Sequence, residues 1–299
     1  MKGTMWILLI VFYLFSVYFL SVLERRVVYK KWDFAAPFSS LAFLLVQEDV
    51  KPHQRDRIFY ETAPVLFIAA ALTAVGVLPF AKGFIITGLS TGALFINAAF
   101  AYIMVAMVMA GWAPNGVYSM IGGWRFLAQL IAYSMPIVMA ITATVMRAES
   151  MSLVDIVTSQ THLWNIIYQP VGFVLFYVAA MALAFLPPFD LPLAPGELAE
   201  GVWAEFTGAR LLLFRLGRLM LILSLSLAVT VLFLGGWEGP LLPGFVWTFI
   251  KTIVVAASFF LCGQFVPRLQ QDDLLEWSWK LMTPLALFNI LWVGILLLL

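Results

Sequence analysis

The sequence predicts an all-α, polytopic membrane protein with about eight transmembrane helices and a cytoplasmic amphipathic segment after helix 1. Of its 299 residues, 63% are hydrophobic and only 11% are charged, and the mean hydropathy is +1.00. A soluble domain cannot hide that much apolar surface. Apolar stretches cover residues 5–23, 62–80, 90–111, 126–146, 170–187, 211–234, 245–265 and 281–299. About 20 apolar residues cross a bilayer as a helix. Since no polar stretch is long enough for a separate domain, residues 1–299 are predicted to form a single integral membrane domain.

The positive charges are distributed unevenly among the links between these stretches. Of the 17 Lys and Arg residues, 13 lie in four of the links or at the adjoining helix ends: links 24–61, 112–125, 188–210 and 267–280. The other four are Lys2, Lys82, Arg147 and Lys251. Positively charged links tend to stay in the cytoplasm. These four links are therefore predicted to be cytoplasmic, with both termini outside a bacterial or archaeal inner membrane. The net charge of +1 is too small to indicate binding to nucleic acid.

The first apolar stretch is predicted to be an uncleaved helix. Lys2 precedes an apolar run, as in a secretory signal, but the run is too long and Glu24-Arg25-Arg26 ends it without a small-residue cleavage pattern. The apolar run from Phe34 to Val46 is too short to span a membrane. It is predicted to be an interfacial or re-entrant helix, which either lies on lipid headgroups or lines a cavity.

Proline and glycine mark the ends of several helices. Trp112 to Gly116 is turn sequence between the third and fourth stretches, and Gly235 to Pro240 is predicted to be a tight external turn. Pro187 and Pro188 end the fifth stretch, because proline removes hydrogen-bond donors and restricts the residue before it. In the link that follows, Glu197 and Glu200 lie three residues apart and can share a helix face.

The chain itself offers no ligands for a redox centre. Cys262 is its single cysteine, which excludes a disulfide or an iron–sulfur cluster held within the chain. Its two histidines, His53 and His162, are predicted to lie on opposite sides of the membrane, which excludes a bis-His haem. Any redox role must come from bound small molecules or partner subunits.

Three cations fall inside or near the apolar stretches. Arg215 and Arg218 lie three apart at the start of stretch 211–234, where they either extend to lipid headgroups or serve a functional site. Lys251 is predicted to be an interfacial anchor beside Trp247.

Several cytoplasmic motifs, taken together, resemble one family. The motifs are Glu24-Arg25-Arg26; Glu48-Asp49 with Asp56-Arg57; Gly122-Gly123-x-Arg125 with Ala128-Gln129 and Tyr133; Pro188-Phe189-Asp190-Leu191-Pro192 with Glu197, Gly201 and Glu205; and Val266-Pro267-Arg268-Leu269 with Asp272. In this order they are similar to the quinone-site membrane subunit of complex I, the proton-pumping NADH:quinone oxidoreductase (the H subunit in bacteria). The two Pro-containing motifs are the most specific, and the chain is identified as a divergent member.

This resemblance implies roles for particular residues. It implies a tunnel in which a quinone, the bound substrate, slides toward a cluster held by docked soluble subunits. The implied quinone-headgroup region is Glu24, Arg25, Arg26, Asp56 and Arg57. The implied proton-coupling residues are Asp190, Glu197, Glu200, Glu205 and Arg218, and the implied partner-docking residues are Arg125, Arg268 and Asp272. No metal or flavin is expected in this chain. The implied partners are hydrophilic redox-arm subunits, which hold the iron–sulfur clusters, and the ion-pump subunits of the membrane arm.

The chain also departs from the family pattern. The segment between Arg26 and Glu48 is shorter, and the family's Gly-Pro-Asn-Arg-Val-Gly-Pro run is missing. Positions that carry acids in the family are here Ser134, Leu193, Pro195 and Arg218. Either proton coupling is re-routed through Arg218 paired with Glu197 or Glu205, or the chain is a divergent relative.

Two other functions compete with the first. One is the membrane anchor of an energy-converting hydrogenase or ferredoxin-linked complex that uses no quinone, which the missing tunnel segment favours. The other is a stand-alone secondary transporter, although the stretches lack mirrored, broken helix pairs and a buried midplane acid. Bound quinone, bound nickel or solute transport by the purified protein would separate the three.

Overall fold

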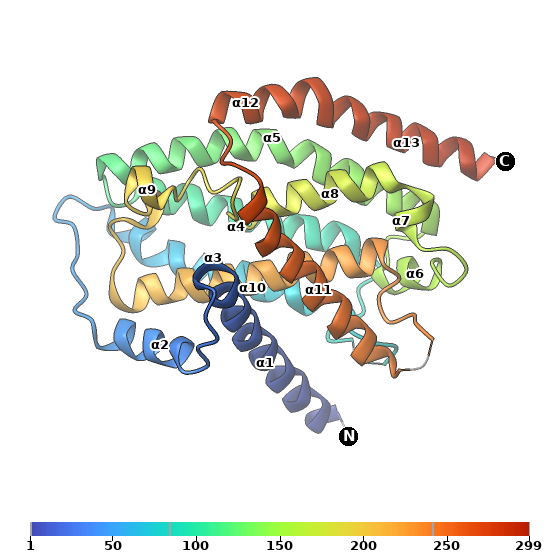
Figure 1. Cartoon of the computed structure of the whole chain (residues 1–299), viewed down its shortest axis with the longest axis horizontal. Helices are drawn as coiled ribbons and strands as arrows, with labels where there is room; N and C mark the ends of the chain where they lie inside the picture. Colours follow the sequence, from blue (N-terminus) through green and yellow to red (C-terminus); the bar gives the residue numbers. More distant parts are fainter. Residues whose placement is uncertain (1, 84, 241, 299) are drawn as a thin grey trace.

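The computed structural model describes residues 2–83, 85–240 and 242–298, and within these ranges the chain is helical without strands (Figure 1). The helices are α1 (Lys2–Tyr29), α2 (Ala36–Val46), α3 (Arg57–Val77), α4 (Gly92–Trp112), α5 (Val117–Ala148), α6 (Leu153–Thr158), α7 (Asn165–Tyr168), α8 (Pro170–Leu183), α9 (Pro195–Leu198), α10 (Gly208–Phe233), α11 (Gly244–Phe265), α12 (Gln271–Trp277) and α13 (Thr283–Leu298). A 3-10 turn covers Gly201–Trp203, and a π-helical turn at Ser278–Met282 joins α12 to α13.

The long helices confirm the predicted fold class. Six helical segments of the described chain are long and apolar enough to cross a membrane: α3, α4, α5, α10, α11 and the continuous α12–α13 segment. Helix α1 is 28 residues long, which is also sufficient length for a span. The structure thus places a helix on each of the eight predicted apolar stretches, and on the short run at Ala36–Val46 as well.

Helix α8 is shorter than its apolar stretch suggests. It has 14 residues, about 21 Å at 1.5 Å per residue, which is less than a typical span. The chain then continues as an irregular segment, residues 184–194, in which Phe185 and Ala194 have positive φ angles and the Pro187–Pro188 peptide bond is cis. Nearly all of this segment is buried, as expected of non-helical backbone in a membrane protein.

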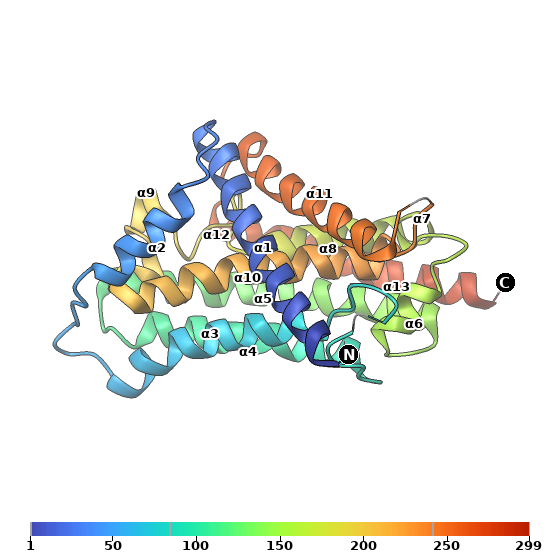
Figure 2. The same cartoon turned by 90° about the horizontal axis from the view of Figure 1, so that it is seen from below.

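Helix α10 occupies the middle of the bundle (Figures 1 and 2). Its second half, from Leu221 to Phe233, is buried on every side, whereas α13 leaves most of its apolar side chains exposed. Small residues allow close helix packing. A Cβ added to Gly111 of α4 would lie 2.8 Å from the Cα of Gly123 in α5, so these two helices touch through their backbones.

The links alternate between the two ends of the bundle. In Figure 1 the four links predicted to be cytoplasmic gather in the left half, while the other links and both ends of the chain lie to the right. Contacts between the links support this grouping, since the Leu269 amide donates to the Pro188 carbonyl at 3.3 Å and the Asp56 amide to the Ala113 carbonyl at 2.8 Å.

Lys251 differs from the predicted interfacial anchor. It does lie near Trp247, with its Nζ 5.8 Å from that ring centroid, but only 8% of the residue is exposed. The Nζ donates to three main-chain carbonyls, at 2.6 Å, 3.1 Å and 2.7 Å, in the turn between α10 and α11: those of Leu234, Gly236 and Glu238. The anchor prediction was therefore wrong, because the ammonium group closes a turn inside the protein.

Candidate functional site

Six of the residues implied by the family resemblance form three ion pairs at the end of the bundle where the four links meet. The pairs join Glu24 of α1 to Arg218 of α10 (Oε1 to Nη1, 3.4 Å), Asp190 to Arg268 (Oδ2 to Nη2, 2.8 Å) and Glu197 to Arg125 of α5 (Oε2 to Nη1, 2.7 Å). We call these six residues the ion-pair row. In the order Glu24, Arg218, Asp190, Arg268, Glu197, Arg125, acidic and basic residues alternate.

The three pairs also act on one another. Arg218 lowers the pKa of Asp190 by its charge, and Arg268 does the same for Glu197. Arg218 therefore favours the charged form of Asp190, and Arg268 favours the charged forms of both Asp190 and Glu197. The row links α1, α10, the segment after α8, the segment after α11, and α5.

Arg218 is fixed by the main chain as well as by an acid. Its Nη2 donates to the Phe185 carbonyl at 3.2 Å and its Nε to the Ala184 carbonyl at 3.5 Å, where α8 has ended. Its acidic partner is Glu24. The predicted pairing of Arg218 with Glu197 or Glu205 was therefore wrong, because the unwound end of α8 directs the guanidinium toward α1.

Asp190 is the most buried acid of the row. Its side chain is 8% exposed. Burial raises the pKa of Asp190 above its ordinary value, and the charges of Arg268 and Arg218 offset that rise only in part. Glu197 is in the opposite situation, since its hydrogen bond with Arg125 and the charge of that arginine lower the pKa of Glu197. Asp190 therefore binds a proton more readily than an ordinary aspartate does, and Glu197 binds one less readily than an ordinary glutamate does.

Two residues of α5 hold the irregular segment after α8 in place. The Gln129 side-chain amide donates to the Ala182 carbonyl at 2.7 Å and to the Phe189 carbonyl at 2.8 Å, one on each side of the proline pair. A Cβ added to Gly122 would lie 2.7 Å from the Pro192 carbonyl oxygen, so only glycine allows the segment to lie this close. Both residues belong to the Gly-Gly-x-Arg motif region, but the sequence offered no reason to place them in the site.

The predicted helix face shared by Glu197 and Glu200 was wrong. Helix α9 ends at Leu198, and Ala199 and Glu200 have left-handed φ angles of 49° and 72°. The chain therefore turns between the two glutamates. Glu197 pairs with Arg125, and Glu200 lies 3.4 Å from Arg215.

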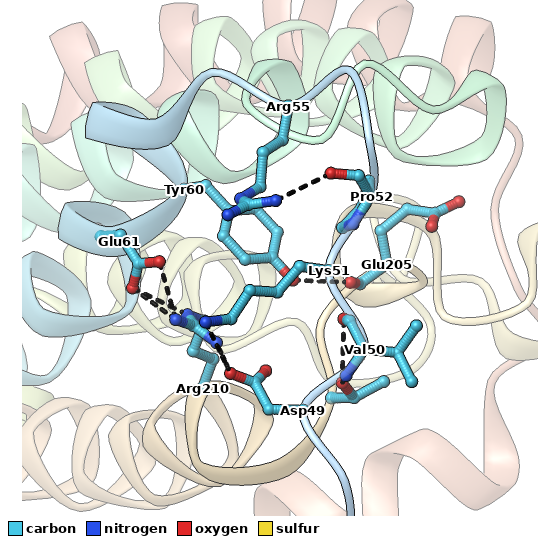
Figure 3. A network of polar contacts seen from close by, with 10 residues as sticks. Asp49, Val50, Lys51, Pro52, Arg55, Tyr60, Glu61, Glu205 and Arg210 are labelled. Atoms are coloured by element: carbon cyan, nitrogen blue, oxygen red, sulfur yellow. Dashed lines mark hydrogen bonds and ion pairs between the residues drawn. The ribbon is translucent and has the colours of Figure 1, made fainter.

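A second charged cluster centres on Arg210, in the first turn of α10 (Figure 3). Its guanidinium donates to both oxygens of the Glu61 carboxylate, from Nε to Oε2 at 3.0 Å and from Nη2 to Oε1 at 2.7 Å, and it also binds Asp49. The guanidinium lies 5.2 Å from the Tyr60 ring centroid. The Tyr60 hydroxyl donates to the Glu205 carbonyl at 2.9 Å. The sequence marked Arg210 only as one of many cytoplasmic cations.

The remaining predicted residues occupy the edge of this face. In α1, Arg25 donates to the Ser40 hydroxyl at 2.6 Å, and Arg26 donates to the Lys30 carbonyl and lies 5.4 Å from the Trp32 ring. Both therefore turn toward the link and toward α2.

Asp56 caps α3 by accepting from the Ile58 amide at 3.1 Å, and it helps to line an open hollow of about 330 Å³ that also includes Arg55 and Trp112. Arg57 is exposed, and so is Asp272 in the first turn of α12. In the described part of the chain, no group of three or more His, Cys, Asp or Glu residues is placed to hold a metal ion.

Comparisons with known proteins agree with one another. A model of the family described as NADH dehydrogenase matches residues 4–294. The second H subunit of NADH-quinone oxidoreductase from Geobacter sulfurreducens is 39% identical over 267 residues, covering 86% of this chain and 81% of the relative. The H subunit of the Brevibacillus brevis enzyme is 37% identical over 258 residues, covering 85% and 77%, and the second H subunit of the Syntrophobacter fumaroxidans enzyme is 38% identical over 273 residues, covering 88% and 82%.

Proposed function

The chain belongs to the NADH dehydrogenase family, among the relatives of the NADH-quinone oxidoreductase H subunits, and from this membership we propose that its ion-pair row forms the junction between a redox arm and a membrane arm. Membership confirms the resemblance derived from the motifs. The chain is a multi-pass membrane subunit of a complex-I-type enzyme, an oxidoreductase that acts as an assembly of subunits.

The observation that carries the proposal is the position of Asp190 in the ion-pair row. Reduction of a quinone to a quinol takes up protons together with electrons. A buried carboxyl with a raised pKa can exchange a proton closer to neutral pH than a solvated one can. Asp190 also contacts Arg268, so a change in its protonation changes the charge balance of the neighbouring pairs.

The alternating row gives this exchange a mechanical consequence. When Asp190 takes up a proton, its attraction for Arg268 and Arg218 weakens, and those arginines favour their other acids, Glu197 and Glu24. The shift therefore passes in both directions, toward α5 and toward α1. Such a rearrangement would connect proton uptake at this face to movement of helices that extend through the membrane.

The quinone headgroup is proposed to bind near Glu24, Arg25 and Arg26, with Asp56 and Arg57 at the rim. An arginine can hydrogen-bond a headgroup oxygen. The electrons would come from iron–sulfur clusters in hydrophilic subunits docked on this face, with Arg125, Arg268 and Asp272 at the docking surface. This face is proposed to be cytoplasmic, with both termini outside and ion-pump subunits alongside in the bilayer.

One observation favours a second function, that of a membrane anchor in a ferredoxin-linked or hydrogenase complex without quinone. Only six residues, 30–35, separate α1 from α2, and α2 presents exposed apolar side chains, including Phe38 and Phe43. A short link leaves less chain to line a tunnel for a long apolar tail. Assaying the purified assembly for bound quinone and for nickel separates the two functions.

The proposal is tested by replacing single acids in the assembled complex. Asp190→Asn and Glu205→Gln are expected to lower quinone reductase turnover, by about a hundredfold if the carboxyl transfers a proton directly. Lys280→Gln is the matched control, because Lys280 is exposed and its ion-pair partner in the described part of the chain is Glu276, in its own helical segment. The abundance of each assembled complex is measured alongside. Turnover and proton pumping at the control rate in both acid variants would refute the proposed role.

A further inference from the structure

Arg210 connects the first turn of α10 to residues 49–61, which are far away in the sequence. Its carboxylate partners are Asp49, in the link between α2 and α3, and Glu61, in the first turns of α3. The Arg210 side chain is only 14% exposed, against 35% for Asp49 and 48% for Glu61. A partly desolvated arginine with a two-pronged carboxylate contact forms stronger and more directional hydrogen bonds than an exposed lysine does.

Two further contacts join the same segments. The Val50 amide donates to the Thr207 hydroxyl oxygen at 2.9 Å, and that hydroxyl donates to the Val50 carbonyl at 3.2 Å. Next to them, Gly208 has a φ of +57°, and a Cβ added there would lie 3.2 Å from the Gln47 carbonyl oxygen. The start of α10 therefore lies directly against residues 47–50, and Figure 3 shows the Arg210 side chain between the two carboxylates.

The same contact includes the end of the acidic segment, which we define as residues 195–207 with Glu197, Glu200 and Glu205. The Tyr60 hydroxyl binds the Glu205 carbonyl, and the Tyr60 ring stacks on Phe206 at 4.6 Å with an interplanar angle of 9°. Residues 47–61 and 205–210 thus form one contact surface. Arg210 forms its main charged contact, because among the described residues it is the one cation that binds both Asp49 and Glu61, whereas Lys51 lies 3.5 Å from Asp49.

The charges explain why removal of Arg210 would separate the segments. Arg210 and Lys51 together balance Asp49 and Glu61, and the hydrogen bond and charge of Arg210 keep the pKa of Asp49 low despite partial desolvation. Without Arg210, Asp49 and Glu61, which lie on the same side of this contact, would lose the cation that binds them to the first turn of α10, and only Lys51 would remain near Asp49. Like charges without a shared counter-ion repel, and desolvated ones do so most strongly.

We propose that Arg210 is a positioning residue that couples the link 47–56 to the acidic segment 195–207, so that the two move as one unit during turnover. The inference rests on the proposed function, which places Asp56, at the end of this link, at the rim of the quinone-headgroup region and assigns the acids of residues 195–207 to proton coupling. Arg210 itself exchanges no proton in this scheme. Its task is to transmit a displacement of one segment to the other.

The first test measures how firmly residues 47–56 are held against the start of α10, and it needs no enzymatic activity. Amide hydrogen exchange of residues 47–56 is followed by mass spectrometry in the purified assembly, for wild type, Arg210→Gln and Lys51→Gln. Loss of charge-assisted hydrogen bonds is expected to speed exchange in this segment about tenfold to a hundredfold in Arg210→Gln. Lys51→Gln, which removes a cation from the same cluster but no bridge, is expected to exchange at close to the wild-type rate.

The second test measures coupling. Protons translocated per quinone reduced are compared in sealed vesicles for Arg210→Gln, Arg210→Lys and Lys51→Gln. This ratio is independent of how much complex assembles, so a merely structural defect leaves it unchanged. We expect the ratio to fall in Arg210→Gln, to recover in part in Arg210→Lys, which can reach one acid but lacks the planar fork, and to stay at the wild-type value in Lys51→Gln.

The results separate this inference from the proposed function. Unchanged exchange in residues 47–56 of Arg210→Gln, or an unchanged ratio of protons to quinone, would overturn the positioning role while quinone reduction by the wild type still supports the proposed function. A wild-type assembly that reduces no quinone would refute the proposed function, and the exchange experiment would still decide whether Arg210 ties the two segments. If Arg210→Gln fails to assemble, Arg210→Lys and Asp49→Asn provide the same comparisons.

Discussion

Asp190 shows how the environment of one residue can set its chemistry. It lies in the buried, irregular segment after α8, where burial raises its pKa while Arg268 and Arg218 act to lower it. Because the folded chain binds this proton more readily than the unfolded chain, Asp190 contributes stability that is fully present below its unfolded pKa of about 3.9 and is lost as pH rises through the higher folded value. Glu197 and Asp49 have lowered pKa values, so their contributions are present above the unfolded values and are lost as pH falls.

Replacing Arg268 by Gln tests the assignment of that pKa. Arg268 is the charged group that does most to lower the pKa of Asp190, and it lies 2.8 Å away. In Arg268→Gln we expect the pKa of Asp190 to move further upward, because burial is then opposed by Arg218 alone among the arginines. The protonated carboxyl band is followed by infrared spectroscopy against pH and assigned by its loss in Asp190→Asn. A downward or absent shift, with Lys280→Gln as reference, would contradict this reading of the site.

The sequence identified all six members of the ion-pair row but not their pairing. The motifs contain Glu24, Asp190, Glu197, Arg125 and Arg268, because those residues lie in recognisable runs. The pairing depends on how distant segments pack. Arg125 and Glu197, for example, are 72 positions apart in the sequence. Arg218 was assigned the wrong acids for this reason, since no local pattern indicates that α8 ends early and that its free carbonyls bind the guanidinium.

At the scale of elements, apolar length predicted where helices form but not where they end. Helix α5 starts at Val117, ahead of the predicted stretch at 126–146, because the turn at Trp112 to Gly116 already reverses the chain. Helix α8 stops at Leu183, before the proline pair, and the apolar residues that follow are buried without being helical. High hydropathy predicts that residues are buried away from water, and a buried irregular segment can be as apolar as a helix.

The turn between α10 and α11 depends on Lys251. Its Nζ binds the carbonyls of Leu234, Gly236 and Glu238 and lies 4.5 Å from the Trp164 ring centroid. In Lys251→Met the side-chain volume is kept but three carbonyls lose their donor, and we expect the free energy of unfolding to fall by about 3 kcal/mol. The measurement is loss of helicity against the mole fraction of a denaturing detergent.

Lys82→Met is the control for that experiment. Lys82 is exposed in the turn between α3 and α4, near the same end of the bundle, and its replacement is expected to change the free energy of unfolding very little. Equal stability of the two variants would show that the Lys251 ammonium group does not close the turn.

At the scale of the whole molecule, the two ends of the bundle have different characters. At one end, in the described part of the chain, the Lys251 ammonium and the Arg147 guanidinium hold turns together by donating to main-chain carbonyls. The other end carries the ion-pair row and the Arg210 cluster, and in both of these charged groups from different links contact each other. An end built from exchangeable ion pairs can change its contacts when one proton is added, whereas an end built from buried main-chain contacts resists such change. This asymmetry underlies the proposal that a redox partner docks on the charged end.

The central claim is tested most directly by labelling single cysteines in membranes, in a Cys262→Ser background, before and after the hydrophilic subunits are stripped off. Glu48→Cys, between α2 and α3, and Asp273→Cys, in α12, place exposed thiols on links at the charged end. Ser90→Cys, between α3 and α4, and Leu242→Cys, between α10 and α11, place them on links at the opposite end (Figure 1). We predict that positions 48 and 273 react with a membrane-impermeant maleimide only from the cytoplasmic side and only after stripping, while positions 90 and 242 react from the outside in both states. Reaction of position 48 or 273 from the outside, or labelling there that is indifferent to stripping, would contradict the account.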